Sequence, residues 1–99
     1  MNLDMPEARL EFRDAIAYYE NCRDGLGLGF LHEVYMSINR IAETPLLWSK
    51  FSFSSRRFLT KRFPYSILYQ ILEDRVLIVA VAHQSRKPGY WKDRFEIVG

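Results

Sequence analysis

The sequence has a single cysteine, Cys22, among its 99 residues. One thiol cannot form an internal disulfide, so we expect no covalent crosslink in the fold, and a cytoplasmic location fits best. The longest apolar run, from Val76 to Ala82, has about seven residues, whereas roughly 20 are needed to cross a bilayer. The N-terminus has no basic region followed by an apolar stretch, so we expect neither a membrane span nor a secretory signal.

The residue sets that bind common cofactors are also missing. Only His32, His83 and Cys22 offer nitrogen or sulfur ligands, and their spacing is not that of a zinc site. The glycines of residues 25–29 join two predicted helices, instead of following a strand as in a phosphate-binding loop. No predicted helix is basic enough to read DNA. We therefore expect no metal, no nucleotide cofactor and no sequence-specific DNA binding by this chain alone.

What the sequence has is the composition of a folded domain, with 48% apolar and 26% charged residues. Its length suits one domain over residues 1–99. The charge is unevenly distributed. Residues 1–49 hold four basic and eight acidic side chains, whereas residues 50–99 hold ten basic and four acidic side chains. The formal net charge of +2 hides this asymmetry. We expect an anionic partner that meets the second half.

The first half predicts two helices. Asp4 is the expected N-cap of the first helix, whose apolar residues recur at three- and four-residue steps until about Cys22 or Arg23. Gly25 is expected to take a left-handed conformation at the reversal, and Pro45 ends the second helix. With so short a connection, the two helices should pack antiparallel.

After Pro45 the apolar pattern becomes extended. Residues 46–55 predict a loop whose aromatic rings pack on the core, and strands are expected at 56–61, 65–72 and 75–83. The middle strand alternates and is expected to be half buried. The last is apolar throughout, which is typical of a central strand covered on both faces. The predicted fold class is α+β, with two N-terminal antiparallel helices packed on a small antiparallel sheet.

Five segments together resemble a known family: AIAYYE (15–20), GLGLGFLHEV (25–34), IAETPLLW (41–48), FPYSILYQI (63–71) and LIVAVAHQSRKPGYW (77–91), followed by Arg94. In order and spacing they resemble the RelE/ParE superfamily of toxins from bacterial type II toxin-antitoxin modules, over nearly the whole chain. One departure is visible. Members usually open with a fuller strand before the first helix, and residues 1–3 leave room for only a stub.

The resemblance implies a growth-inhibiting, plasmid-stabilising toxin that a cognate antitoxin masks. RelE-like members cleave messenger RNA in the ribosomal A site, whereas ParE-like members inhibit DNA gyrase and are not enzymes. The segment His83-Gln84-Ser85 after the apolar strand looks ParE-like, and no acid/base pair is evident, so the gyrase inhibitor is the first hypothesis. An mRNA endoribonuclease is the alternative, and a degenerate, non-toxic member that still binds antitoxin is a third.

A ribonuclease of this kind needs a base, an acid and fixed cations around the reacting phosphate. If the chain is RelE-like, the candidate catalytic residues are Lys61, Arg62 and Arg86 as cations and His83 and Tyr90 as proton carriers. Each of these residues also has an explanation that is purely structural.

His83 ends a buried strand, on the face predicted to hold Leu77, Val79 and Val81, where a hydrogen-bonded histidine is the commoner case. Trp91 is expected to fold the tail back onto the sheet. Charged residues on an outer strand commonly protect its edge from unwanted pairing.

The expected partner is an antitoxin tail, partly disordered when free, that docks as a helix or added strand along the helical hairpin and the basic sheet. This hypothesis requires the cations to share one exposed face, not to pair with the helix carboxylates. The predicted partner-binding residues are Arg56, Arg57, Lys61, Arg62, Arg86 and Arg94.

Overall fold

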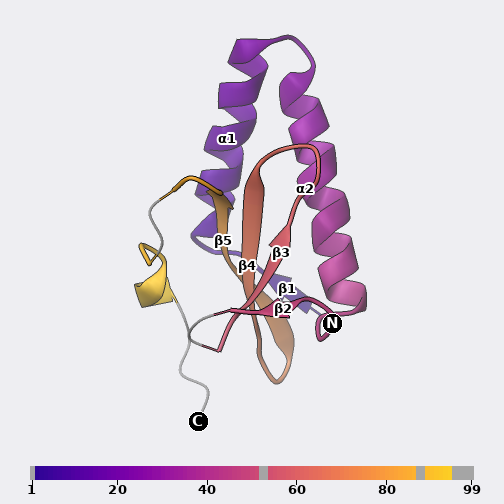
Figure 1. Ribbon diagram of the computed structural model, residues 1–99, viewed down its shortest axis with the longest axis vertical. Helices are drawn as coiled ribbons and strands as arrows, with labels where there is room; N and C mark the ends of the chain where they lie inside the picture. Colours follow the sequence, from indigo (N-terminus) through magenta and orange to yellow (C-terminus); the bar gives the residue numbers. More distant parts are fainter. Residues whose placement is uncertain (1, 52–53, 87–88, 95–99) are drawn as a thin grey trace.

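The computed structural model describes residues 2–51, 54–86 and 89–94, which form two helices beside a five-stranded sheet (Figure 1). In the described part of the chain, no helix is long and apolar enough to cross a membrane. The elements are β1 (Asn2–Asp4), α1 (Ala8–Cys22), α2 (Leu26–Glu43), β2 (Ser49–Lys50), β3 (Arg56–Leu59), β4 (Tyr65–Ile71), β5 (Arg75–His83) and the 3-10 turn η1 (Lys92–Arg94).

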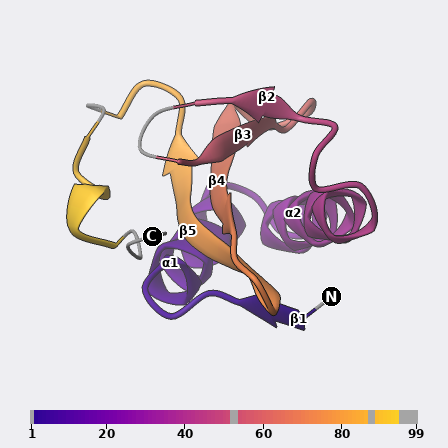
Figure 2. The ribbon, with the colours of Figure 1, turned by 90° about the horizontal axis from the view of Figure 1, so that it is seen from below.

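The strands follow the order β1-β5-β4-β3-β2, and both helices lie on one side of the sheet (Figure 2). All neighbouring strands are antiparallel except β1 and β5, which are parallel. The α+β class with two antiparallel helices on the sheet is therefore confirmed. The prediction that the middle strand is half buried is wrong, because β4 is the central strand and is buried on both faces from Tyr65 to Gln70.

The start of the first helix differs from the prediction. Asp4 is not its N-cap, because Asp4 belongs to β1 and pairs with Leu77 of β5. Helix α1 begins at Ala8 after Glu7, whose side chain makes no capping hydrogen bond. The N-terminal stub thus pairs with the sheet, and the Asp4 carboxylate lies 3.5 Å from Arg75 Nε of β5. The end of α1 at Cys22 agrees with the prediction.

The reversal between the helices depends on Gly25 and Glu20. Gly25 has φ +85°, the predicted left-handed conformation, although it serves as the N-cap of α2 and does not close α1. The Glu20 carboxylate accepts hydrogen bonds from the backbone N–H groups of Gly25 and Gly27, both at 3.0 Å. A side chain on α1 therefore satisfies the free N–H groups at the start of α2.

The main core lies between the helices and the sheet. Phe30 and Val34 of α2 and Ile67 and Ile78 of the sheet are fully buried there. The Phe30 ring lies 5.1 Å from that of Phe63, edge to face, a favourable arrangement for aromatic pairs. This packing fixes both helices against β4 and β5.

A β-bulge interrupts the pairing of β4 and β5. Leu68 pairs with Ala80, whereas Tyr69 pairs with Ile78, so Val79 is an extra residue in β5. Such an insertion shifts the alternation of side chains by one position. The two faces of β5 are consequently exchanged at this point.

The predicted environment of His83 is wrong because of this bulge. Val81 packs in the core on the helix side, whereas Leu77 and Val79 belong to a second cluster on the opposite side. His83 itself is exposed at the end of β5. A uniformly apolar strand contains no sequence signal that marks which residue is inserted.

The opposite side of the sheet, which we call the outer face, is partly covered by the C-terminal segment. Trp91 is 5% exposed and packs with Leu68, Leu77 and Val79, as predicted for a tail that folds back on the sheet. The predicted loop at residues 46–55 is wrong in one respect, because it contains β2.

Within this segment Ser49 pairs with Arg57, and Trp48 packs against the core with its ring 4.5 Å from that of Phe58. Phe51 is 37% exposed, and Phe53 lies outside the described residues.

Candidate functional site

Two arginines from different elements line a small depression on the outer face, which we call the outer-face hollow. Arg57 of β3 lies across from Leu68, and the turn after β5 carries Arg86, whose N–H donates to the His83 carbonyl at 2.9 Å. The hollow measures about 100 Å³ and is lined by Phe51, Arg57, Ser66, Leu68, Ala82, His83, Gln84, Arg86 and Trp91.

Aromatic rings hold both guanidinium groups. The Arg57 guanidinium carbon lies 4.8 Å from the centre of the Phe51 ring, and that of Arg86 lies 4.1 Å from the centre of the Tyr90 ring. These are favourable cation-π distances. Within the described residues no carboxylate forms an ion pair with either arginine. Both arginines keep their positive charge available to a ligand.

The hydrogen bonds of His83 define its neutral tautomer. The Ser85 backbone N–H donates to His83 Nδ1 at 3.1 Å, and Ser85 Oγ lies 2.7 Å from the same nitrogen. Because a backbone N–H can only donate, Nδ1 is an acceptor, and the neutral ring carries its proton on Nε2. The His83 ring lies 5.3 Å from the ring of Tyr65, a residue of the helix-side core, so the imidazole lies toward the helix side of the sheet.

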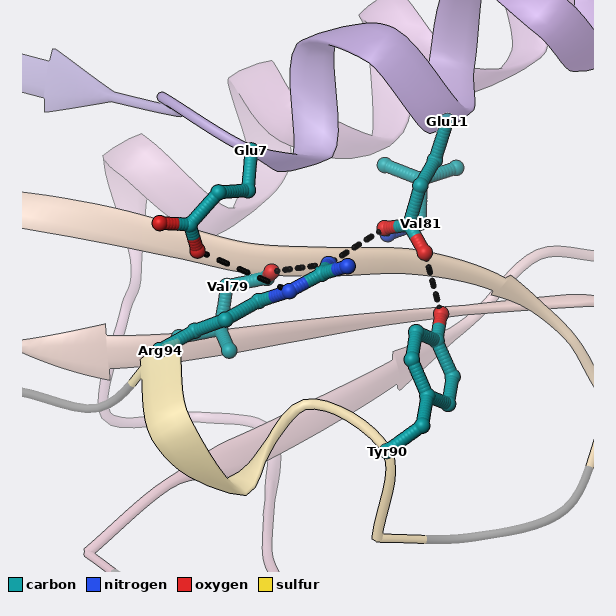
Figure 3. A network of polar contacts seen from close by, with 6 residues as sticks. All are labelled: Glu7, Glu11, Val79, Val81, Tyr90 and Arg94. Carbon is teal, nitrogen blue, oxygen red and sulfur yellow. Dashed lines mark hydrogen bonds and ion pairs between the residues drawn. The ribbon is translucent and has the colours of Figure 1, made fainter.

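A network around Glu11 of α1 anchors the C-terminal segment (Figure 3). Tyr90 Oη donates to Glu11 Oε2 at 2.5 Å, and Arg94 Nη1 lies 2.8 Å from Glu11 Oε1. Arg94 also donates to the Val79 carbonyl at 3.1 Å, and its Nε lies 3.5 Å from Glu7. Arg94 is thus paired with helix carboxylates.

The same network changes the acidity of Tyr90. Burial raises the pKa of the Tyr90 hydroxyl far above its usual range, and the hydrogen bond to the Glu11 carboxylate raises it further. A phenol in this environment keeps its proton at neutral pH. Tyr90 is consequently a poor general base.

The remaining predicted cations lie elsewhere. Arg56 Nη1 donates to the Leu46 and Trp48 carbonyls at 3.1 and 2.7 Å, which fixes the chain before β2. The backbone N–H groups of Lys61 and Arg62 donate to Glu33 Oε2 at 2.8 and 2.7 Å.

These last two bonds hold the turn between β3 and β4, and the side chains of Lys61 and Arg62 are exposed there. Lys61 lines a second depression of about 350 Å³, the edge hollow, together with Arg40, Trp48, Ser49, Arg57, Phe58 and Leu59.

The structure therefore groups only part of the predicted site. Arg57, His83 and Arg86 line one hollow with Tyr90 beside it, whereas Lys61 and Arg62 lie at the β3–β4 turn. The expectation that all cations share one exposed face is wrong for Arg56, which binds carbonyls, and for Arg94, which is ion-paired.

The sequence analysis did not identify Glu11, because no local pattern indicates its contacts with Tyr90 and Arg94, which lie 79 and 83 positions away. It also missed Arg40, which is an unremarkable exposed residue near the end of α2 until the fold places it beside Lys61. Among residues 2–51, 54–86 and 89–94, no three His, Cys, Asp or Glu side chains are grouped to hold a metal ion.

Comparison with known proteins agrees with this architecture. The family model described as "ParE toxin of type II toxin-antitoxin system, parDE" matches residues 5–88. A search of curated protein sequences found no match. A solved structure titled "Chromosomal ParDE TA system from P. aeruginosa" is similar in fold, with a TM-score of 0.63 and 12% identity over 84% of this chain and 95% of that chain. By the family match over both helices and most of the sheet, the chain belongs to the ParE toxin family of type II toxin-antitoxin systems.

Proposed function

We propose that this toxin blocks growth by binding DNA gyrase and inhibiting it, without catalysing a reaction of its own. The observation that carries the proposal is the ParE family match over residues 5–88. The family resemblance seen in the sequence implies gyrase as the target of the ParE-like branch. Both the proposed target and the proposed antitoxin act in the cytoplasm, where we place the chain.

The state of the candidate catalytic groups supports a binding protein. RNA cleavage needs a base that can take a proton from the ribose hydroxyl and an acid that can give one to the leaving oxygen. The Tyr90 hydroxyl instead donates to Glu11, and its pKa is raised. Lys61 and Arg62 lie at the β3–β4 turn, away from the outer-face hollow that His83 and Arg86 line.

The direct test is a supercoiling reaction with purified toxin, gyrase, relaxed plasmid and ATP. We expect supercoiling to be inhibited in proportion to toxin, while messenger RNA stays intact in a translation reaction that holds the same toxin. If neither effect appears, and cells that express the chain without antitoxin grow normally, the degenerate hypothesis replaces this one.

The RelE-like ribonuclease is the second candidate, favoured by the shared position of His83 and Arg86 in the outer-face hollow. Under this alternative, translation-dependent mRNA cleavage is observed, and it is lost in Arg86→Ala and in Tyr90→Phe while the fold persists. Cleavage without any effect on gyrase would overturn the first proposal.

We further propose that a cognate antitoxin neutralises the chain by docking an acidic, amphipathic segment over the edge hollow. Leu59, which is 48% exposed, lines the edge hollow, and Met36, which is 44% exposed, lines the adjoining depression; both offer apolar contacts. Arg40 and Lys61 line the same region and, within the described residues, form no ion pair. Apolar contacts flanked by free cations suit a helix that carries carboxylates along one side.

A further inference from the structure

We propose that the outer-face hollow is a binding site for a phosphate group, either free or carried by a nucleic acid. This inference does not depend on which target the toxin inhibits. It follows from the donors that line the hollow and from the absence of acidic side chains among the lining residues that the structure describes.

The two guanidinium groups are prepared to bind an anion. Arg57 and Arg86 reach the hollow from β3 and from the turn after β5, and each stacks on a ring, Phe51 or Tyr90. Stacking on a ring face restricts the planar guanidinium and leaves its edge N–H groups open. Such groups bind phosphate oxygens in pairs, with geometric specificity as well as charge.

One neutral donor in the same hollow is unpaired within the described residues. The hydroxyl of Ser66 makes no hydrogen bond with a described residue, and Ser66 is only 8% exposed. Because Ser66 lines the hollow, its hydroxyl can donate a hydrogen bond to an oxygen of a bound ligand. Trp91 also lines the hollow, and its buried indole N–H serves as a nearby reporter of binding.

The number of donors favours phosphate over a carboxylate from a protein partner. Two guanidinium forks and the Ser66 hydroxyl line the space, whereas a carboxylate has only two oxygens. Phosphate contacts in proteins come from these same groups, arginine above all and hydroxyls next. A volume of about 100 Å³ is enough for one small anion.

Arg86 also lines a neighbouring depression with Glu11 and Asp14 of α1, whose charges oppose an incoming anion. Among the residues that the structure describes, Arg57 has no such acidic neighbour in either of its hollows. Arg57 is therefore expected to contribute more to phosphate affinity than Arg86.

The experiment is an NMR titration of the full chain with inorganic phosphate, with chloride adjusted to hold the ionic strength constant. The indole N–H signal of Trp91 is the probe, assigned with Trp48→Phe. We expect a saturable shift of this signal and a smaller one for Trp48. Affinity should fall about tenfold in Arg57→Gln, as for loss of one charge-assisted hydrogen bond, and less in Arg86→Gln.

Arg62→Gln is the matched control, since the Arg62 guanidinium also lies over a ring, that of Phe63 at 5.3 Å, but outside the hollow. It should keep the affinity of the unmodified chain. If Arg57→Gln disturbs the fold, Ser66→Ala removes one donor with little change in volume and should also weaken the binding. Equal losses in Arg57→Gln and Arg62→Gln would overturn the proposal, because they would indicate general charge attraction.

A second arm of the titration distinguishes the two sources of phosphate. A short single-stranded oligonucleotide that moves the Trp91 signal at lower concentration than inorganic phosphate indicates a nucleic-acid backbone. A shift with inorganic phosphate alone indicates the free anion, and either result supports the site. No saturable shift with either probe, or tighter binding of a glutamate peptide of equal charge, would contradict it.

Discussion

At the scale of single residues, Glu11 contributes most to the position of the C-terminal segment. Its carboxylate accepts hydrogen bonds from Tyr90 and Arg94 and lies 3.3 Å from the Val81 backbone N–H (Figure 3). One side chain of α1 thereby connects β5 and the tail. Contacts that share one acceptor group reinforce one another in a partly buried site.

We predict that Glu11→Gln lowers the free energy of unfolding by about 2 kcal/mol, because it removes the closer and more buried of the two carboxylates that pair with Arg94. The side chain of Glu11 is only 16% exposed. Glu7→Gln is the matched control, since Glu7 is 56% exposed and lies 3.5 Å from Arg94, and it should cost at most about 0.5 kcal/mol. Urea unfolding measures both, and similar losses would contradict the assigned role of Glu11.

Buried tyrosines predict how stability changes at high pH. Burial raises the pKa of Tyr65 to about 12, and burial likewise raises the pKa of Tyr69 to about 12 despite the opposing charge of Arg56. An unfolded tyrosine titrates near pH 10. Between about pH 10 and 12 the unfolded chain therefore loses protons that the native state keeps, so the free energy of unfolding falls as pH rises.

Tyr69→Phe should make this fall shallower while lowering stability at neutral pH, where the hydrogen bond from Tyr69 to the Pro45 carbonyl is lost. Urea unfolding at a series of pH values checks both effects. The slope of the free energy of unfolding against pH between pH 6 and 8 serves as the internal reference, because no tyrosine titrates there in either the native or the unfolded state. A slope above pH 10 identical to that of the unmodified chain would show that Tyr69 does not contribute.

At the scale of elements, two glycines of α2 meet different surroundings. A Cβ on Gly27 would lie 2.6 Å from the Ile16 carbonyl oxygen and 2.9 Å from Glu20 Cβ, so α1 and α2 approach closely only because Gly27 has no side chain. A Cβ on Gly29 would lie 3.2 Å from Arg62 Nη1, the end of a flexible side chain that can move.

We predict that Gly27→Ala destabilises the protein by about 1 to 3 kcal/mol, because the helices must separate. Gly29→Ala should be neutral or stabilising by up to about 1 kcal/mol, because alanine favours a helix interior more than glycine does. Thermal or urea unfolding of the two variants side by side is the measurement. A Gly27→Ala protein as stable as Gly29→Ala would disprove the close helix contact.

Elements also differ in how far local sequence predicts them. The reversal before α2 and the end of α2 follow from Gly25 and Pro45, since glycine and proline act on the backbone at or next to their own positions. The role of Asp4 was not predictable in this way, because its partner in the ladder lies on β5, more than 70 positions away. The inserted Val79 was not predictable either, because every neighbouring side chain is apolar.

At the scale of the whole molecule, the charge asymmetry between the two halves becomes two cationic regions that share Arg57. Arg57 and Arg86 serve the outer-face hollow, while Arg40 of the acidic half joins Lys61 at the edge hollow. Cations from the two halves of the sequence, Arg40 and Lys61, thus line the same hollow. The candidate site was predictable in its residue types but not in its grouping.

For the proposed antitoxin surface, we predict that the double change Arg40→Glu and Lys61→Glu weakens antitoxin binding at least tenfold and reduces its dependence on salt, because free cations at the contact are replaced by like charges. The matched control is Arg9→Glu with Arg13→Glu, two exposed positions on α1 that change the net charge equally. Calorimetric titration at several salt concentrations measures both pairs. Equal weakening by the two pairs would show that net charge alone governs the binding.

The sequence by itself determined the class of fold, the ends of both helices, the places of the main strands and the family resemblance, because helical and strand periodicity and turn residues act over a few positions. The tertiary structure alone decided that Arg94 is paired with α1, that a bulge turns Val81 toward the helices and that Arg57 meets Arg86. These outcomes depend on contacts between residues far apart in the chain, and such contacts form only when the whole sheet and both helices pack together.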